Sequence, residues 1–444
     1  MGNAAKRNIL ILTIDAWRAD FVSSFAGVSL TPNLQQLAGH TATCKQAYTS
    51  APWTTPGIVS MFTGQDALSH GVGFRWSELH KNTQTLPSLL AKTGYRIHNF
   101  CYKTSSCNYR DFGFAPQHAP DYPGGPEDNF LPEILARLAE SDENRPWLGW
   151  YHYKYVHLPY WPAPEYRRLF LSDDLQVPIH VRETVGRLAT IPRCSHRFYS
   201  HDRDIVQRLY AANVLRMDEF LGKVFESLRA SGQLESTTII ITSDHGDEHL
   251  EHGHLGHAST ARHATLYEEV LRIPLLLIDS RIDGPHMIRE LVQIQDLMPT
   301  LLSLAGVMAP TTCPDAVDLS PLLFESLRGD RVSPSTSLTS SQGFQRPLRF
   351  HSSRMGFQAE RCHANQSIVG FREGPMKYVV ERFGRERRWL FDLDVDPLEQ
   401  NPRQFGSAVR QAHQRLMGLC RGINGTHADP HERSPWRRLS QLYG

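Results

Sequence analysis

Two short runs of β-branched and aliphatic residues, each followed closely by an acidic side chain, place the strongest constraint on the fold of this chain. The runs are Asn8–Ile14 and Thr237–Thr242, and neither alternates between apolar and charged residues. A continuous run of this kind is typical of a central parallel strand that is buried on both faces. Asp15 follows the first run directly, and Asp244 follows the second after one serine. The sequence therefore predicts an open α/β sheet whose ligands bind at the carboxyl ends of the strands.

The rest of the first 310 residues alternates between predicted helices and strands, which is the pattern of a doubly wound, mostly parallel sheet flanked by helices. Further strands are predicted at 95–102, 147–156 and 272–278. Helices are predicted at 31–39, 86–93, 203–229 and 296–305. Residues 104–127 are rich in Ser, Asn, Gly and Pro, so we expect a loop there that shapes a substrate pocket.

The character of the chain changes near residue 311, where Pro, Ser and Thr become common. We therefore expect a catalytic domain over 1–310 and a small C-terminal α+β subdomain over 311–444. Short strands of an antiparallel sheet are predicted near 367–371, 376–383 and 389–393, followed by a helix at 402–421 and a polar tail.

Composition excludes several classes of function. Lys and Arg total 47 and Asp and Glu 46, so no nucleic-acid partner is expected. No apolar stretch approaches the roughly 20 residues that cross a bilayer, and the first apolar run lacks a cleavage site, so we expect no membrane partner. Seven scattered cysteines without C-x-x-C spacing indicate reduced thiols. We therefore expect a cytoplasmic protein that acts on a small-molecule ester, alone or as a homo-oligomer.

The segment from Thr54 to Gly64 offers a candidate nucleophile. Pro56 suits the first turn of a helix, because its missing N–H would have no partner there, and Gly64 can end that helix. The Thr54 hydroxyl would then lie at a helix N-terminus, where free amides favour an anion. The simpler interpretation is that Thr54 only caps the helix.

A metal site is predicted from residues that end strands or begin a helix. Asp15, Asp244, His245 and the Thr54 oxygen can converge at the carboxyl edge of the sheet. The imidazole favours Mn, Zn or Fe, while Ca and Mg remain open. A metal at this position would lower the pKa of the threonine hydroxyl, which is otherwise a poor nucleophile.

Histidines are concentrated between residues 244 and 263, and most of them are expected to lie in a solvated loop. His257 and His263 are stronger candidates for the active site, because a buried strand follows and holds their loop near the sheet edge. Lys103 and His157 could supply positive charge to a bound oxyanion. For each of these two, a surface or structural role remains the alternative.

Several motifs together resemble the sulfatase branch of the alkaline phosphatase superfamily, over about residues 7 to 400. The motifs are Asn8–Asp15 with Arg18-Ala-Asp20, Ala51–Gly64, Gly94–Arg96 leading to Lys103, His157-Leu-Pro-Tyr, Thr242–Gly246, Leu266–Pro274, Gln295–Gly306 and Leu390–Glu399. The resemblance implies an alkaline phosphatase-like fold and an ester hydrolase that depends on a divalent metal. It also implies that Lys103 binds the oxyanion, and that one of His257 and His263 takes the place of the family's active-site His or Lys.

The departures from the family pattern concern the nucleophile and the metal. Sulfatases convert a Cys or Ser at this position to formylglycine, and Thr54 cannot be converted. Gly57 and Ile58 replace the Ser and Arg of the motif. Ala16 stands where many sulfatases carry a second aspartate, and His245 stands where calcium-dependent members often have Asn.

These departures favour a hydrolase or transferase of phosphate, phosphodiester or phosphonate esters that works through a covalent phospho-threonine. Threonine followed by x-Pro is similar to the nucleotide pyrophosphatase and phosphodiesterase relatives. One firmly held metal is expected, with a second only if His257 or His263 recruits it. A sulfatase without formylglycine is the first alternative, and a non-catalytic binding descendant is the second.

Overall fold

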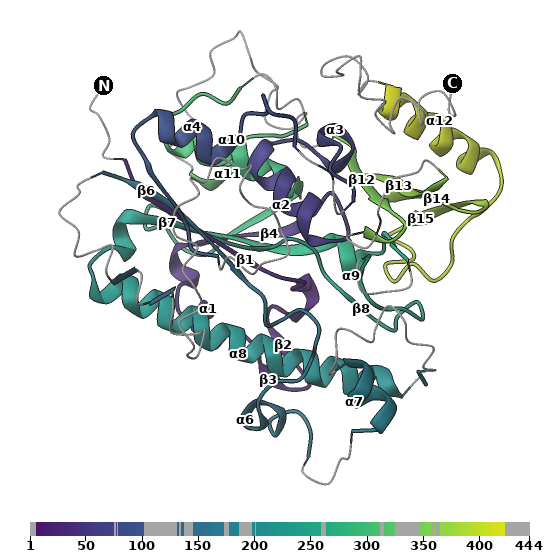
Figure 1. The fold of residues 1–444 in the computed structure, drawn as a ribbon, viewed down its shortest axis with the longest axis horizontal. Helices are drawn as coiled ribbons and strands as arrows, with labels where there is room; N and C mark the ends of the chain where they lie inside the picture. The colour runs from purple at the N-terminus through teal and green to yellow at the C-terminus, as the bar shows by residue number, and fades with distance from the viewer. Residues whose placement is uncertain are drawn as a thin grey trace.

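The computed structural model describes residues 6–74, 77, 79–101, 131–132, 135–136, 145–172, 177–185, 198–199, 201–258, 263–310, 315–324, 346–356, 359 and 365–421. Its centre is a seven-stranded sheet in the order β11-β4-β10-β7-β1-β6-β5 (Figure 1). The strands are β1 Asn8–Ile14, β4 Thr41–Tyr48, β5 Arg96–Asn99, β6 Trp147–Tyr153, β7 Thr237–Ser243, β10 Arg272–Ile278 and β11 His286–Gln293.

Strand β1 lies between β6 and β7 and runs parallel to both. Thr13 pairs with His152 of β6, and Ile14 pairs with Ser243 of β7, so the three carboxyl ends are level with one another. Strand β10 runs antiparallel to its neighbours β7 and β4. The sheet is therefore mixed, with most of its pairings parallel, as the alternation of elements predicts.

Alternate residues of β1 face two separate hydrophobic cores. Leu10 and Leu12 pack into the core that includes α8 (Asp202–Ala230), whereas Ile9 and Ile11 pack into the core that includes α2, α4 and α10. These three helices span Thr54–Thr63, Leu86–Lys92 and Leu297–Leu304. Figure 1 shows α2, α4 and α10 on one face of the sheet and α8 on the other. Burial on both faces explains why the run at Asn8–Ile14 does not alternate.

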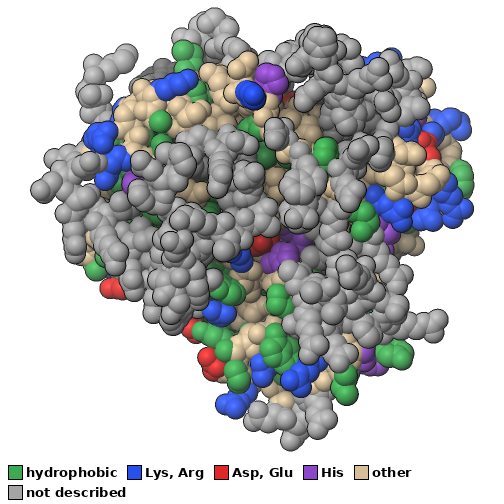
Figure 2. Space-filling view, in the orientation of Figure 1, with side chains coloured by type: hydrophobic (Ala, Val, Ile, Leu, Met, Phe, Trp, Pro, Cys, Tyr) green, Lys and Arg blue, Asp and Glu red, His purple; other side chains and the backbone are tan. Residues whose placement is uncertain are grey.

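A second, four-stranded antiparallel sheet has the order β12-β13-β14-β15. Its strands are β12 Leu348–Ser353, β13 Gln366–Glu373, β14 Met376–Phe383 and β15 Glu386–Asp392. Helix α12 (Ser407–Arg421) packs on this sheet through Val409 and Leu416. Lys and Arg side chains gather over this part of the molecule, on the right of Figure 2.

The two sheets meet in a hydrophobic cluster that contains Trp53, the residue before the predicted nucleophile. Trp53 is buried there with Phe350 of β12, Ile368 of β13 and Val379 of β14. The start of α2 is therefore packed against the C-terminal sheet as well as the central one. Within the described ranges, no helix is both long and apolar enough to span a membrane.

The structure differs from the sequence-based expectations in several elements. Strands β4 and β11 had not been predicted, because polar residues interrupt both of them. Strand β5 is shorter than the predicted strand at 95–102, and α1 (Pro32–Gln35) is shorter than the helix predicted at 31–39. The loop predicted at 104–127 lies outside the described residues.

Candidate active site

The carboxyl ends of β6, β1 and β7 bring together the side chains of the candidate site. Asp15 follows β1, His152 lies near the end of β6, and Asp244 follows β7. One donor atom from each of these three side chains lies within 4.8 Å of the others, and all three side chains are buried. The neighbouring positions of these strand ends therefore assemble a compact set of two carboxylates and one imidazole.

Thr54 is the first residue of α2, and it does not cap that helix. The N-cap residue is Trp53, without a side-chain hydrogen bond to the helix, and Gly64 ends the helix with φ +67°. The hydroxyl Oγ1 of Thr54 lies 3.3 Å from Nε2 of His245. The side chain is therefore directed at the metal-ligating residues.

Gly57 allows α2 to approach the end of β7 closely. A Cβ atom at this position would lie 2.5 Å from the carbonyl oxygen of Asp244, well inside contact distance. Gly246 has the same role on the other side of His245, because a Cβ there would lie 2.1 Å from the carbonyl oxygen of Glu269. The glycine that replaces the motif's serine is thus required by packing between the nucleophile helix and the Asp244 strand.

The predicted metal ligands have the separations of atoms that share one ion. His245 Nε2 lies 3.5 Å from Asp15 Oδ1 and 3.4 Å from Asp244 Oδ2. Tetrahedral ligands about 2.1 Å from a metal lie roughly 3.4 Å apart. Asp15 Oδ1, Asp244 Oδ2 and His152 Nε2 are buried without a hydrogen-bond partner. Since buried polar atoms are normally paired, these atoms fit a bound cation.

The pKa shifts of the two carboxylates also fit a bound cation. Burial raises the pKa of Asp244. Burial also acts to raise the pKa of Asp15, but His157 and His152 outweigh it and lower that pKa. Two neighbouring buried carboxylates repel each other when both are ionised, and a divalent cation removes that cost.

His152 completes the ligand set, and sequence reasoning missed it. Its Nδ1 lies 2.8 Å from the hydroxyl of Thr13, which also accepts the indole N–H of Trp150 and faces the carbonyl of Tyr151. With its own proton directed to that carbonyl, the hydroxyl accepts a hydrogen bond from the Nδ1–H of His152, which leaves the Nε2 lone pair for a metal. The sequence did contain a signal for His152, because it is a histidine near the end of a strand predicted to lie in the same sheet as the strands that precede Asp15 and Asp244.

His245 is oriented in the same way. Its Nδ1 donates to the carbonyl of Gly246 over 2.8 Å, so its Nε2 lone pair faces Asp15 and Asp244. A second group with metal-compatible spacing consists of His245, Asp247 and His257. Because His245 Nε2 also lies beside Asp15 and Asp244, His245 is shared between the two candidate groups.

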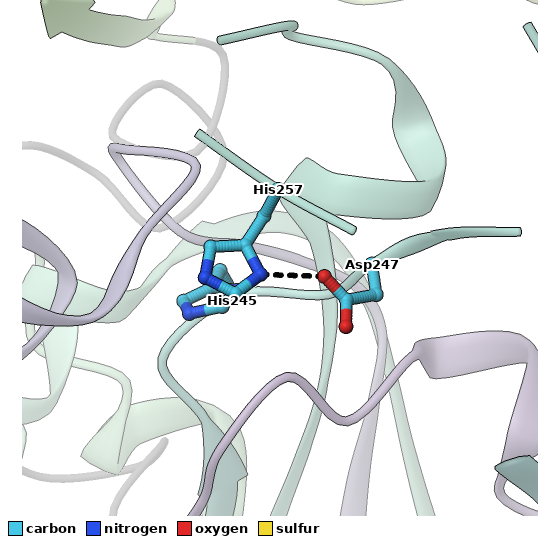
Figure 3. A group of neighbouring side chains, drawn as sticks. All are labelled: His245, Asp247 and His257. Atoms are coloured by element: carbon cyan, nitrogen blue, oxygen red, sulfur yellow. Dashed lines mark hydrogen bonds and ion pairs between the residues drawn. The ribbon is translucent and has the colours of Figure 1, made fainter. Parts of the chain in front are cut away.

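His257 is held beside this site by Asp247. Its Nδ1 lies 2.6 Å from Asp247 Oδ1, and its ring lies 4.2 Å from that of His245, centroid to centroid (Figure 3). The hydroxyl of Tyr160 donates to the other oxygen of Asp247. Asp247 and Tyr160 had not been predicted as site residues, although Asp247 lies two positions after His245. They fix the orientation of the His257 ring through its Nδ1.

The surroundings shift the pKa values of the two histidines beside the predicted metal ligands in opposite directions. Burial, together with His245, lowers the pKa of His257 to about 4. Burial also acts to lower the pKa of His157, but Asp15 and Asp247 outweigh it and raise that pKa. The rings of His157 and His257 lie 4.8 Å apart. Burial and His245 thus disfavour a proton on His257, whereas the two carboxylates favour one on His157.

The remaining predicted residues lie elsewhere. The ring of His263 contacts His254 and Phe383 of the C-terminal sheet, so the structure brings His257 rather than His263 to the metal ligands. Lys103 lies outside the described residues. His249 is not in a solvated loop but is fully buried among Phe21, Tyr160 and Tyr210.

Fold and site together are those of an ester hydrolase with an alkaline phosphatase-like core, in which a threonine at a helix N-terminus lies beside the candidate metal ligands. The model of the sulfatase family matches residues 7–307. The chain belongs to the sulfatase family.

Individual relatives are distant and cover most of the chain. Choline-sulfatase of Rhizobium meliloti (strain 1021) is 23% identical, over 99% of this chain and 95% of its own length. The multifunctional alkaline phosphatase superfamily protein PehA of Trinickia caryophylli is 23% identical, over 73% of this chain and 78% of its own. The crystal structure of the phosphonate monoester hydrolase of Agrobacterium radiobacter superposes with a TM-score of 0.70 at 18% identity, covering 94% of this chain and 95% of that one. Enzymes of this family depend on divalent metals, in agreement with the ligand set.

Proposed function

We propose that this chain cleaves phosphate, phosphodiester or phosphonate esters through attack of Thr54 on phosphorus. The observation that carries the proposal is the position of the Thr54 hydroxyl, 3.3 Å from His245 Nε2 and at the start of α2. A threonine side chain cannot become the aldehyde hydrate of sulfatases, so the unmodified hydroxyl is the available nucleophile. A phosphonate monoester hydrolase among the structural relatives supports this choice of ester.

Each side chain of the site has a role in this reaction. Asp15, Asp244, His245 and His152 would hold a divalent ion, which would lower the pKa of a coordinated hydroxyl and offset charge on the attacked centre. Thr54 Oγ1 forms a bond to phosphorus as the bond from phosphorus to the ester oxygen breaks, and the hydroxyl proton of Thr54 passes to that leaving oxygen, which gives phospho-threonine and an alcohol. His157 carries positive charge toward the phosphoryl oxygens.

The second half of the reaction releases Thr54. The Nε2 of His257, held by Asp247, takes a proton from water or from an acceptor alcohol, which then attacks phosphorus and restores the threonine. Water gives hydrolysis, and an alcohol gives transfer. An anionic phosphoryl group nearby favours the protonated form of His257, which suits it to return the proton to a leaving group.

The proposal is tested with Thr54→Ala and Thr54→Ser on aryl phosphate, phosphodiester, phosphonate and sulfate esters, each with metals added back. Thr54→Ala should lose at least about 10³-fold in kcat, whereas Thr54→Ser should keep measurable turnover. A rapid quench followed by mass spectrometry should find phosphate on the peptide that contains Thr54. Full metal-dependent turnover by Thr54→Ala on every ester would contradict the proposal.

A sulfate ester hydrolase without formylglycine is the second candidate, because choline-sulfatase aligns with nearly the whole chain. The same panel separates the two candidates. A kcat/KM on the sulfate ester that exceeds every phosphorus ester, lost in Thr54→Ala, would favour the sulfatase.

A further inference from the structure

The β14–β15 hairpin and the start of α12 border an open groove of about 710 Å³, far along the chain from the metal ligands. We call it the basic groove, because Arg385, Arg387, Arg388 and Arg410 line it. Among the described residues that line it, Glu386 is the one carboxylate. The gathering of Lys and Arg side chains on the right of Figure 2 lies over this region.

The arginines of the basic groove are only partly neutralised. Glu386 is shared by Arg382, at 2.7 Å, and Arg388, at 2.6 Å. Arg387 lies 3.6 Å from Glu381. Arg385 and Arg410 form no ion pair with any side chain that the structure describes. The groove therefore keeps a local positive excess in a chain whose formal net charge is only +1.

The positive charge of these arginines also affects the pKa values of two neighbouring groups. Partial burial, followed by Arg388, lowers the pKa of His413 on α12. Burial acts to raise the pKa of Glu386, but hydrogen bonds from Arg388 and Arg382 outweigh it and lower that pKa. Both directions are those expected near guanidinium groups.

Two aromatic rings lie among these charges. Phe405 is 88% exposed, and Trp389 lines the same groove. The segment around Phe405 is held along the edge of β15 because Leu390 and Arg403 exchange two backbone hydrogen bonds of 2.9 Å. Gly406, with φ +109°, then turns the chain into α12. The ring of Phe405 is therefore presented to solvent by a fixed backbone.

We infer that the basic groove binds an acidic oligosaccharide, with its sulfate or carboxylate groups on the arginines and the apolar face of a sugar ring on Phe405 and Trp389. Guanidinium groups match such oxyanions with two parallel hydrogen bonds. The near-zero net charge and the short extent of the patch argue against nucleic acid, whose dense and extended charge requires a broad basic surface. This inference does not depend on the reaction proposed for Thr54.

The test is a titration of the full chain with a sulfated hexasaccharide at several salt concentrations. The variant Arg385→Gln/Arg410→Gln should weaken binding by about tenfold or more and lower the slope of log K against log salt by about two. Phe405→Ala, which removes a side chain that is almost fully exposed, should weaken binding several-fold without loss of stability. All these variants should keep the wild-type turnover of a small aryl ester.

Matched controls separate the basic groove from general charge effects and from the active site. Arg229→Gln/Arg289→Gln removes the same charge from exposed positions elsewhere and should leave binding within twofold of wild type. Thr54→Ala should bind the hexasaccharide as wild type does, whatever its turnover. Equal losses in the two arginine pairs, no binding at low salt, or tighter binding of single-stranded DNA of equal charge through Arg385 and Arg410 would each overturn the inference.

Discussion

His152 shows how a single residue can change the interpretation of the metal site. Without it, the ligands resemble a carboxylate site with one imidazole, and with it they include two imidazoles and two carboxylates. A site with two imidazoles prefers Mn, Zn or Fe over Ca more strongly than a site with one imidazole. The Thr13 hydroxyl, which fixes the tautomer of His152, is part of the same arrangement.

We predict that His152→Ala weakens metal binding by about 10- to 100-fold, because it removes one ligand while the others remain. Competition with a chromophoric chelator would measure the affinity. His201→Ala, at a histidine side chain that is 69% exposed, serves as the control and should bind metal as wild type does. Unchanged affinity in His152→Ala would show that His152 is not a metal ligand.

At the scale of elements, the contact between α2 and β7 decides where the nucleophile lies. The carbonyl of Asp244 occupies the space that a side chain at Gly57 would need. The serine that this motif usually contains could not be accommodated here without a shift of the helix. The replacement of serine by Gly57 is thus coupled to how closely α2 approaches the metal ligands.

We predict that Gly57→Ala lowers both the free energy of unfolding, by about 1–3 kcal/mol, and kcat, because α2 must move away from Asp244. The same substitution at Gly418, in α12 with no atom within 4 Å of the new Cβ, should instead stabilise by up to about 1 kcal/mol. Urea unfolding and turnover of the best ester would measure both. A Gly57→Ala variant with wild-type stability and kcat would be incompatible with this packing.

The sequence predicted elements well where both faces are buried and poorly where they are not. Strands β1, β7 and β10 were recognisable as continuous apolar runs, whereas β4 and β11 were not. The reversed direction of β10 had no local signal, because strand direction depends on the path of the whole chain.

The residues of the candidate site were likewise predictable only where a local sequence pattern marked them. Asp15, Thr54, Asp244 and His245 were predictable because each ends a strand or begins a helix, and the structure brings them together. His152 and Asp247 act through neighbours that are distant in sequence, Thr13 and Tyr160, so no local pattern identified them. The choice of His257 over His263 also required the fold.

At the scale of the whole molecule, two neutral histidines, the buried His351 and the partly buried His70, lie on elements that contact each other, β12 and α3. His70, on α3 (Ala67–His70), accepts the amide of Val72, and His351 lies in β12 of the C-terminal sheet. Burial lowers the pKa of each to about 3. Their unfolded pKa is about 6.5. The stability they contribute is therefore present above pH 6.5 and is lost as the pH falls toward their folded pKa values.

We predict that His351→Gln makes the protein less sensitive to acid. Wild type should lose about 2 kcal/mol more than the variant in its free energy of unfolding between pH 7 and pH 5. Urea unfolding at both pH values, with a chelator to remove metal, measures the difference. His201→Gln should keep the full pH dependence of wild type. Parallel losses in wild type and His351→Gln would show that His351 is not held neutral in the folded state.

Because β1 lies between β6 and β7 in the sheet but precedes both in the chain, it is synthesised before either of its partners. Both partners of β1 are made long after it, because Trp147 begins β6 and Thr237 begins β7. At about 5–20 residues per second, the ribosome needs roughly 10–50 s to pass from Asp15 to Asp244. During that interval this apolar strand has no partner on either edge. The nascent chain must therefore be shielded from aggregation until the predicted metal ligands have all emerged.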